Sequence, residues 1–123
     1  MNNMREILFK AKRKDDGEWV EGYYFYNANI KKHYIKTWIC YYEVDQETIC
    51  QYIGLTDKNG KKIWENDIVY ARCKGLSAKG IIAYEKGCLV IKENKRQRTY
   101  SLFGDWKLRT DGNIFDNAEL LEG

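Results

Sequence analysis

The stretch "GLTDKNGKKIWENDIV", residues 54–69, decides how the fold is interpreted, because it holds the densest group of turn-forming residues in the chain. Asp57, Asn59 and Gly60 stand together in its first half, and "END" follows a short apolar pair in its second half. Such a segment is either a loop that holds a phosphate or a metal ion, or a pair of corners between strands. The spacing of its residues distinguishes the two.

This segment does not have the residue spacing of a ligand-binding loop. A phosphate-binding P-loop needs Gly, four residues, and then Gly-Lys-Ser/Thr. Here Gly54 and Gly60 enclose five residues, and Lys61 is followed by a second lysine. A calcium-binding EF-hand loop fails as well, because Gly60 comes too early after Asp57. The pattern therefore favours corners over a binding loop.

The same residues suit a hairpin. The segment "DKNG", residues 57–60, predicts a type I turn that ends with Gly60 in the left-handed region, as in three-residue hairpin loops. Ile63 and Trp64 then form a short return strand. Asn66 is among the residues that best tolerate a positive φ, so we expect a sharp corner there.

The remaining chain alternates strand-like segments with turns, which predicts a mainly β fold. Hydrophobic residues make up 44% and aromatic residues 15%, enough for a buried core, and proline is absent. Turn signals include "DDG" at 15–17 and "DGN" at 111–113. The strand-like segments are "REILFKAK" (5–12), "EWVEGYYFY" (18–26), "HYIKTWICYY" (33–42), "ETICQYI" (47–53), "DIVYARC" (67–73), "KGIIAYE" (79–85), "CLVIKE" (88–93) and "RTYSLF" (98–103). They indicate a barrel or sandwich of hairpins.

Only the last segment favours a helix. In "DNAELLE", residues 116–122, Asp116 is placed to cap a helix and Glu119 follows three residues later, as a capping box requires. So short a helix is stable only when it docks on the sheet.

Sites for catalysis or metal binding are not indicated. His33 is the single histidine, which excludes a two-histidine metal site, and the four cysteines form no C-x-x-C pair. Cys40, Cys50 and Cys88 lie in apolar segments and are expected to be core residues of a protein from a reducing compartment. We find no catalytic constellation, so we expect no enzyme, no metal and no cofactor.

The chain carries no apolar stretch typical of a signal peptide or a membrane-spanning helix. We therefore expect a cytoplasmic protein that has no membrane partner.

Basic side chains are concentrated in one region of the sequence. The net charge is only +3, but residues 72–98 hold eight basic residues and two acidic ones. Such a basic face would meet an anionic partner, and Tyr84 or Tyr100 would lie near enough to stack on bases. The alternative is an ordinary solvated hairpin tip. The candidate nucleic-acid-binding residues are Lys92, Lys95, Arg96 and Arg98.

An aromatic run is the second candidate site. Tyr23, Tyr24, Phe25 and Tyr26 are consecutive, and neighbours in a strand point to opposite faces. Either both faces of this strand are covered within the domain, or one face joins a partner subunit. Tyrosine is enriched at protein interfaces because it buries a large area and keeps a polar tip.

Three stretches together resemble the YopX-like family of phage and prophage proteins. "REILFKAK" is similar to the family's "REIKFRAW"-like strand, and "QYIGLTDKNGKKIWENDIV" to its "QYTGLKDKNGKEIYEGDIV" pattern. "GNIFDNAELLE" is similar to a "GNIYENPELL" ending. Two positions depart from the family: Asn66 replaces a glycine, and Ala118 replaces a proline.

The resemblance implies a mostly β fold with a small SH3-like barrel, additional N-terminal strands and a short C-terminal helix. Residues 1–123 would form one domain, either undivided or built from an N-terminal β region (residues 1–53) that packs on a barrel-like region (residues 54–123). It also implies a phage or prophage origin and a bacterial cytoplasm. It supplies no catalytic or ligand residues.

These observations favour a non-enzymatic accessory protein, either a protein-binding module or a homo-oligomer, whose partner is a host or phage protein. The alternative is a nucleic-acid-binding β-barrel that uses the basic 72–98 face.

Overall fold

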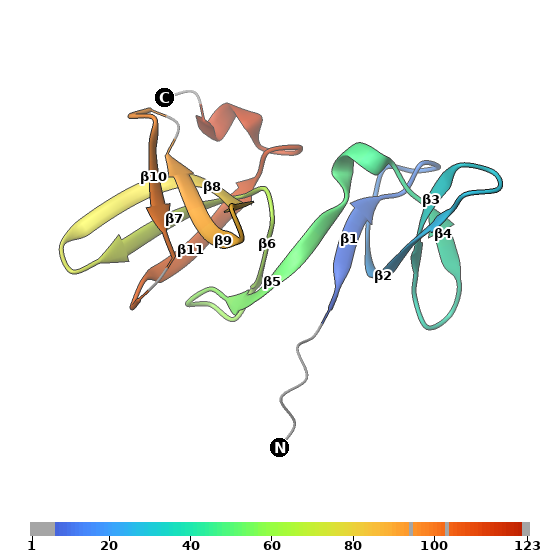
Figure 1. Ribbon diagram of the computed structural model, residues 1–123, viewed down its shortest axis with the longest axis horizontal. Coiled ribbons are helices and arrows are strands. Elements are labelled where there is room, and N and C mark those ends of the chain that lie inside the picture. The colour runs from blue at the N-terminus through green and yellow to red at the C-terminus, as the bar shows by residue number, and fades with distance from the viewer. Residues whose placement is uncertain (1–6, 94, 103, 122–123) are drawn as a thin grey trace, which may run out of the picture. The chain divides into compact units, whose positions relative to one another are not determined.

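The computed structural model describes residues 7–93, 95–102 and 104–121. Arg5 and Glu6 of the first expected strand lie outside the described residues, as do Asn94, Phe103 and Glu122. Within them the chain forms eleven β-strands and two short 3₁₀ helices (Figure 1). The mainly β prediction is therefore confirmed. Neither helical element among the described residues is long and apolar enough to cross a membrane.

The chain divides into two compact units, unit 1 (Met1–Tyr52) and unit 2 (Ile53–Gly123). The predicted packing of an N-terminal region on a barrel-like region stays a prediction. Unit 1 holds β1 (Phe9–Lys12), β2 (Trp19–Asn27), β3 (Lys32–Lys36), β4 (Tyr41–Glu43) and the helix η1 (Gln46–Thr48), and β5 (Cys50–Thr56) runs from it into unit 2. Unit 2 holds β6 (Lys62–Trp64), β7 (Asp67–Cys73), β8 (Leu76–Glu85), β9 (Cys88–Glu93), β10 (Arg98–Ser101), β11 (Lys107–Asn113) and the helix η2 (Ala118–Leu121).

In unit 1 the strands are hydrogen-bonded in the order β4-β3-β2-β1-β5, all neighbours described being antiparallel. Ala11, Ile35 and Val44 form its buried cluster, against which Phe9, Val20, Tyr24 and Ile49 pack. One strand prediction was wrong. The segment 33–42 is a hairpin instead of a single strand, because Thr37 hydrogen-bonds Cys40 and closes a turn between β3 and β4.

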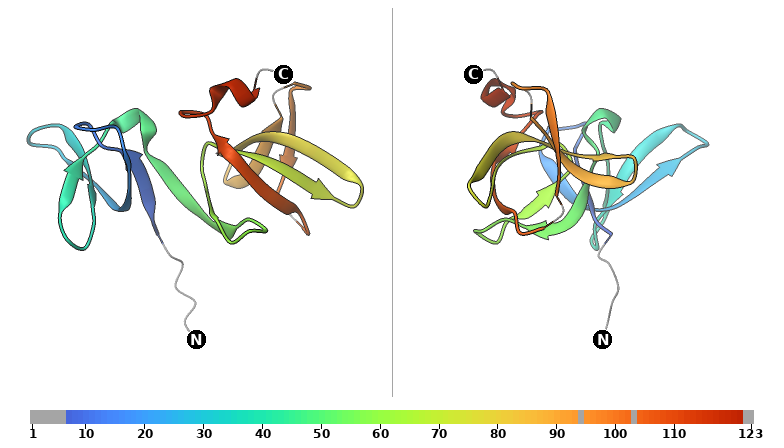
Figure 2. Two further views of the ribbon diagram at one scale, coloured as in Figure 1. Left: turned by 180° about the vertical axis from the view of Figure 1, so that it is seen from behind. Right: turned by 60° about the vertical axis from the view of Figure 1, so that its left-hand side comes forward.

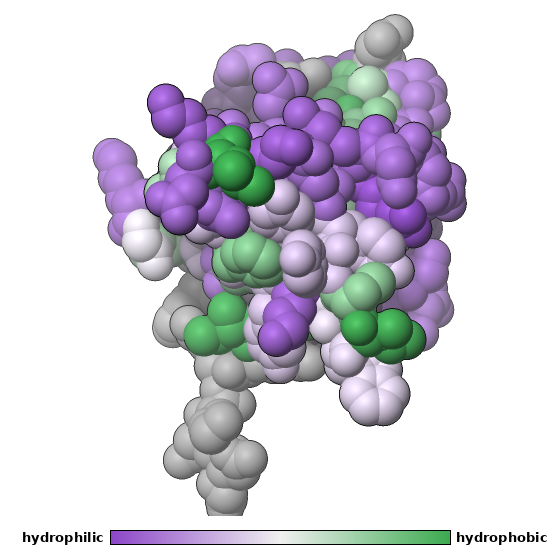
Figure 3. All heavy atoms as spheres, turned by 90° about the vertical axis from the view of Figure 1, so that its right-hand side faces the viewer, coloured by the Kyte–Doolittle hydropathy of each residue, from purple (hydrophilic) through white to green (hydrophobic). Residues whose placement is uncertain are grey.

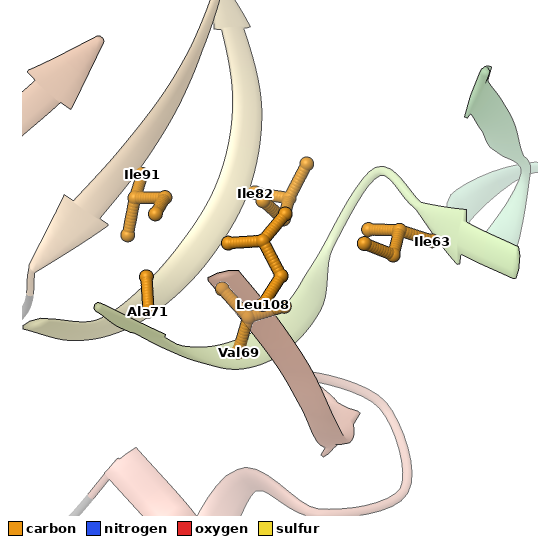
Figure 4. Close-up of a cluster of buried hydrophobic side chains, with 6 residues drawn as sticks. All are labelled: Ile63, Val69, Ala71, Ile82, Ile91 and Leu108. Atoms are coloured by element: carbon orange, nitrogen blue, oxygen red, sulfur yellow. The ribbon is translucent and has the colours of Figure 1, made fainter. Parts of the chain in front are cut away.

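In unit 2 five strands are ordered β10-β9-β8-β7-β11. The strands β7 to β10 form a meander, and β11 returns to lie beside β7 (Figure 2). Figure 4 shows side chains of β6, β7, β8, β9 and β11 that point toward one another. They form a buried cluster of Ile63, Val69, Ala71, Ile82, Ile91 and Leu108.

Two predictions for unit 2 need correction. The five-stranded sheet is not closed into a barrel within the described residues, since β10 and β11 are its two edges. The stretch "DGN" at 111–113 is not a turn but the end of β11, where the register with β7 shifts between Thr110 and Gly112. Such a bulge bends a strand without ending it.

The expected C-terminal helix is a 3₁₀ helix of four residues, not an α-helix. The turn before it is held by Asn113, whose side-chain oxygen accepts hydrogen bonds from the backbone N–H groups of Phe115 and Asp116. Leu120 donates its N–H to the Asn117 carbonyl. Asparagine side chains that bond nearby backbone groups favour turns over longer helices, which accounts for the short element.

The corners of the opening stretch are confirmed. Gly60 has φ +84° and donates its N–H to the Asp57 carbonyl over 3.0 Å, as in the predicted turn. Asn66 has φ +70°, in the left-handed region. Of the three cysteines predicted to be buried, only Cys50 is; Cys40 and Cys88 are exposed. Cys40 lies in the exposed turn after β3, and Cys88 directly follows the exposed turn at 86–87, so solvent reaches both side chains.

Candidate functional site

The polar centre of the opening stretch is Asp57, which is buried with 6% of its surface exposed. One carboxylate oxygen accepts hydrogen bonds from the backbone N–H groups of Asn59 (2.8 Å) and Lys61 (3.0 Å). The other accepts bonds from the Thr110 N–H (3.1 Å) and the Thr110 hydroxyl (2.9 Å). The carboxylate thus joins the β5–β6 turn to β11.

These bonds set the charge state of Asp57. Burial on its own would raise its pKa, but the donors from Thr110, Lys61 and Asn59 outweigh burial and lower the pKa to about 2. A carboxylate that accepts four hydrogen bonds is stable as an anion and has little basicity left for proton transfer. A hollow of about 310 Å³ lies beside it, lined by Leu55, Leu102 and Trp106 among others. The Asp57 carboxylate therefore has a structural role, and we name it with its hydrogen-bond donors Asn59, Lys61 and Thr110 the Asp57 clamp.

The aromatic run in β2 divides between the two faces of the unit 1 sheet, as its alternation predicts. Tyr24 packs against the buried cluster and lies opposite Ile35. Tyr26 lies opposite His33 on the same face, with ring centroids 4.6 Å apart. The Tyr24 hydroxyl lies 2.6 Å from His33 Nδ1. These two tyrosines and the histidine form one aromatic and polar group, in which Tyr26 is 47% exposed.

The other half of the run faces away from the cluster. Phe25 stacks on Tyr34 at 5.1 Å between ring centroids, and Tyr41 meets both rings edge-on at 5.9 and 5.4 Å. Tyr23 lies beside them, opposite Lys36, and is 67% exposed. Figure 3 shows one side of unit 1, where hydrophobic and near-neutral residues gather in the lower half of the view.

The turn from β3 to β4 joins the two strands that carry Tyr34 and Tyr41. Trp38 is 95% exposed and Ile39 80% exposed. The hydroxyl group of Thr37 holds the turn. It accepts hydrogen bonds from the backbone N–H groups of Ile39 and Cys40, and it donates one to the Cys40 carbonyl. A hydrogen-bonded turn therefore presents two apolar side chains to solvent. We name Tyr23, Phe25, Tyr34, Trp38, Ile39 and Tyr41 together the aromatic surface.

The sequence predicts two of the six residues of this surface. Tyr23 and Phe25 belong to it, whereas Tyr24 and Tyr26 lie on the opposite face of β2. Trp38 and Ile39 fall within a segment whose composition predicts a strand. Thr37 is the sequence feature that indicates this turn. A threonine side chain often hydrogen-bonds the backbone groups two and three residues further along the chain and so starts a turn.

The four predicted nucleic-acid-binding residues do not share one surface. Lys92 lies on the β9 face turned away from the buried cluster and forms an ion pair with Glu85 at 2.6 Å. Lys95 and Arg96 lie in the exposed turn between β9 and β10. Arg98 lies opposite Glu93, on the side of the sheet that Ile91 occupies. Tyr84 and Tyr100 also lie on that side, away from Lys92.

A different basic group shares the face of Lys92. Side chains directly opposite each other in neighbouring strands lie on the same face of a sheet. Lys107 is opposite Arg72, and Arg109 is opposite Tyr70, which is opposite Lys79. None of these positions belongs to the side that Val69, Ala71 and Leu108 fill. We name Arg72, Lys79, Lys92, Lys107 and Arg109 the basic sheet face.

Sequence reasoning missed Lys107 and Arg109 because β11 was not recognised as a strand. In "KLRTDGN" the alternation of Lys107, Leu108 and Arg109 is a weak strand signal, and the following Gly112 was interpreted as a turn. Among residues 7–93, 95–102 and 104–121, no group of three or more His, Cys, Asp or Glu side chains is placed to hold a metal ion.

Comparison with known proteins agrees with the motifs. No curated protein matches the chain. The family model described as YopX protein matches residues 8–122, nearly the whole chain, and so covers the Asp57 clamp, the aromatic surface and the basic sheet face. The protein therefore belongs to the YopX family.

Proposed function

We propose that this protein is a non-enzymatic accessory module of phage or prophage origin that acts in the bacterial cytoplasm and binds another protein through its aromatic surface. The observation that carries the proposal is the turn in which Thr37 holds Trp38 and Ile39 out in solvent. A folded chain gains no stability from an apolar pair so exposed. Burial against a partner supplies the missing contact.

Interface chemistry supports this role. Tryptophan and tyrosine dominate the residues whose truncation weakens protein complexes most. The turn is already ordered by three hydrogen bonds of the Thr37 hydroxyl, so little conformational entropy is lost when Trp38 is buried. The rings of Phe25, Tyr34 and Tyr41 contact one another on β2, β3 and β4.

The candidate partners are a host or phage protein and a second copy of this chain. We also infer that unit 2 is a variant of the SH3-like fold. The order β10-β9-β8-β7-β11 supports this, because a four-stranded meander whose fifth strand returns beside the first is the SH3-like order. Such folds serve many unrelated functions, so the fold supports a binding role only by analogy.

The test compares the wild type with the double variant W38A/Y41A. The wild type is expected to form either a homo-oligomer in light scattering or a complex with a protein identified by capture from the host bacterium and then purified. The variant is expected to weaken that complex about 30-fold or more, the effect of losing a residue worth about 2 kcal/mol. Isothermal titration calorimetry measures the affinity with purified partners.

The matched control is L76A/Y84A, which removes two side chains that are each 43% exposed in unit 2. The control is expected to bind as the wild type does. Equal binding by W38A/Y41A, or a strict monomer that captures no partner, would contradict the proposal.

The second candidate function is nucleic-acid binding by the basic 72–98 segment. The observation in its favour is that Lys95 and Arg96 are exposed at the β9–β10 turn and that the neighbouring sheet carries further basic side chains on one face. Binding that is lost steeply with added salt is expected. Salt-independent binding, or none at low salt, would exclude this function.

A further inference from the structure

The basic sheet face of unit 2 holds charges that nothing in the described chain neutralises. Two of its members have acidic partners: Arg109 bonds Asp111 at 2.9 Å, and Lys92 pairs with Glu85. Arg72, Lys79 and Lys107, in contrast, form no ion pair with any residue that the structure describes. The unpaired charges come from three adjacent strands, β11, β7 and β8.

Their spacing concentrates positive potential. Adjacent strands lie about 4.8 Å apart, so Lys107 and Arg72, directly opposite each other, are close neighbours. Like charges placed opposite each other destabilise a sheet. An arrangement that is unfavourable in the free protein becomes favourable when a polyanion replaces the counter-ions of these side chains.

A hollow adjoins the same edge of the face. It has a volume of about 230 Å³ and is lined by Arg72, Cys73, Lys74, Gly75, Asp105 and Lys107. Three of these residues are basic and one is acidic. The face thus has a recess in which basic side chains from the β7–β8 turn and from β11 surround one position.

Tyr70 stands among the cations and gives the face a surface for stacking. The Arg109 guanidinium lies 5.0 Å from the Tyr70 ring centroid, and Lys79 is opposite Tyr70 on β8. Bases of single strands stack on aromatic rings and on guanidinium planes, whereas duplex grooves are entered by protruding helices or ribbons. An aromatic and guanidinium pair on a sheet therefore fits unstacked bases better than a duplex.

We propose that unit 2 binds single-stranded nucleic acid on the basic sheet face, with Arg72, Lys79 and Lys107 contacting phosphates and the Tyr70–Arg109 pair contacting bases. This inference rests on the second candidate function and gives it a location. The predicted hairpin residues Lys95 and Arg96 lie outside the face.

The test measures fluorescence anisotropy of a labelled single-stranded oligothymidylate of about 15 nucleotides, a length within the range that small β-barrel domains cover. The face variant R72A/K79A/K107A is expected to bind at least about tenfold more weakly at low salt. Its plot of log affinity against log salt concentration should be flatter by about two, because each phosphate contact with a single strand contributes about 0.7 to the slope. The charge-conserving variant R72K/K79R/K107R should keep most of the affinity.

Two controls locate the effect. The variant K14A/K31A/K58A removes the same number of exposed basic side chains at other places and is expected to bind within about threefold of the wild type. The variant K95A/R96A removes the two exposed basic side chains from the hairpin turn and is also expected to bind within about threefold of the wild type. All substituted side chains are exposed, so circular dichroism should show the fold unchanged.

The outcomes separate this inference from the function on which it rests. If the face variant binds as tightly as the wild type and K95A/R96A loses binding, the site lies at the hairpin turn. That result would overturn the inference but would leave nucleic-acid binding as the function. Tighter binding of a duplex than of the single strand would overturn the inference as well. No binding of any oligonucleotide by the wild type at low salt would overturn both.

Discussion

Asp57 joins segments of unit 2 that are 53 positions apart in the sequence, through its two bonds to Thr110. The same carboxylate closes its own turn through Asn59 and Lys61. One buried anion thus connects a local hairpin to a distant strand. The opening stretch predicts the local half, since "DKNG" is a turn signal. The distant half has no signal, because nothing in the sequence near Thr110 indicates which acidic group it meets.

The first prediction concerns the charge of Asp57. Its folded pKa of about 2 lies below the ordinary 3.8, so its contribution of about 2 kcal/mol is complete above about pH 5 and is lost as the pH falls toward 2. Asp57→Asn should lower the free energy of unfolding by about 2–3 kcal/mol at pH 7, because an amide N–H₂ then faces backbone donors. Urea denaturation between pH 7 and pH 2 measures both effects.

The difference between wild type and D57N should shrink as the pH falls from about 5 to 2. Asp105→Asn, at an exposed position, serves as the control and should change the stability by less than about 0.5 kcal/mol. A stability difference that stays constant over this range would show that the carboxylate's charge does not stabilise the fold.

At the scale of elements, Gly80 marks a position where β9 leaves no room for a side chain on β8. A Cβ atom at this position would collide with the Lys92 carbonyl and lie 2.8 Å from Ile91 Cγ2. Both obstacles belong to β9, and Gly80 itself is buried with an ordinary φ. The glycine is therefore required by the spacing of two strands and not by a turn.

The second prediction follows from this spacing. Gly80→Ala should lower the free energy of unfolding by at least about 2 kcal/mol, since the added methyl group can be accommodated only if β9 moves. Ser77→Ala on the same strand is exposed and should cost less than about 0.5 kcal/mol. Thermal unfolding followed by circular dichroism compares the two. Equal stability of both variants would mean that β9 moves aside at no cost.

At the scale of elements, the sequence predicts strands from local patterns but does not predict which distant strands pair. The predicted ends of β7 and β9 match the observed ones, because a short run of consecutive apolar residues and flanking turn signals define each strand locally. The turn at Thr37 and the strand β11 were missed, since each contradicts the apparent pattern of its own segment. The order of the sheet and its open edges depend on pairing between distant strands, which composition does not encode.

At the scale of the whole molecule, the described residues form two buried clusters that share no residue. One contains Ala11, Ile35 and Val44 in unit 1, and the other centres on Ile82 and Ile91 in unit 2. The candidate surfaces are divided in the same way, because the aromatic surface belongs to unit 1 and the basic sheet face to unit 2. Each surface depends on the cluster of its own unit for its support.

The third prediction tests this division. Ile35→Ala and Ile82→Ala each remove a fully buried side chain and should each cost about 2–5 kcal/mol in their own unit. Amide hydrogen exchange followed by NMR should show faster exchange mainly in β2 and β3 for I35A, and mainly in β7 to β9 for I82A. Uniform acceleration across both units in either variant would show that the chain unfolds as one cooperative structure.

The return of β11 to β7 has a consequence for synthesis on the ribosome. The described strands β1 to β5 are complete once Thr56 has emerged, so their pairing can form while translation continues. In unit 2, β7 can pair with its second neighbouring strand only after Lys107–Asn113 have been made. The Asp57 carboxylate can accept its bonds from Thr110 only at the same stage. During that interval the nascent chain carries an unpaired strand edge, the kind of edge that associates with other chains. Among the described strands β11 is translated last, and it is the strand that covers this edge.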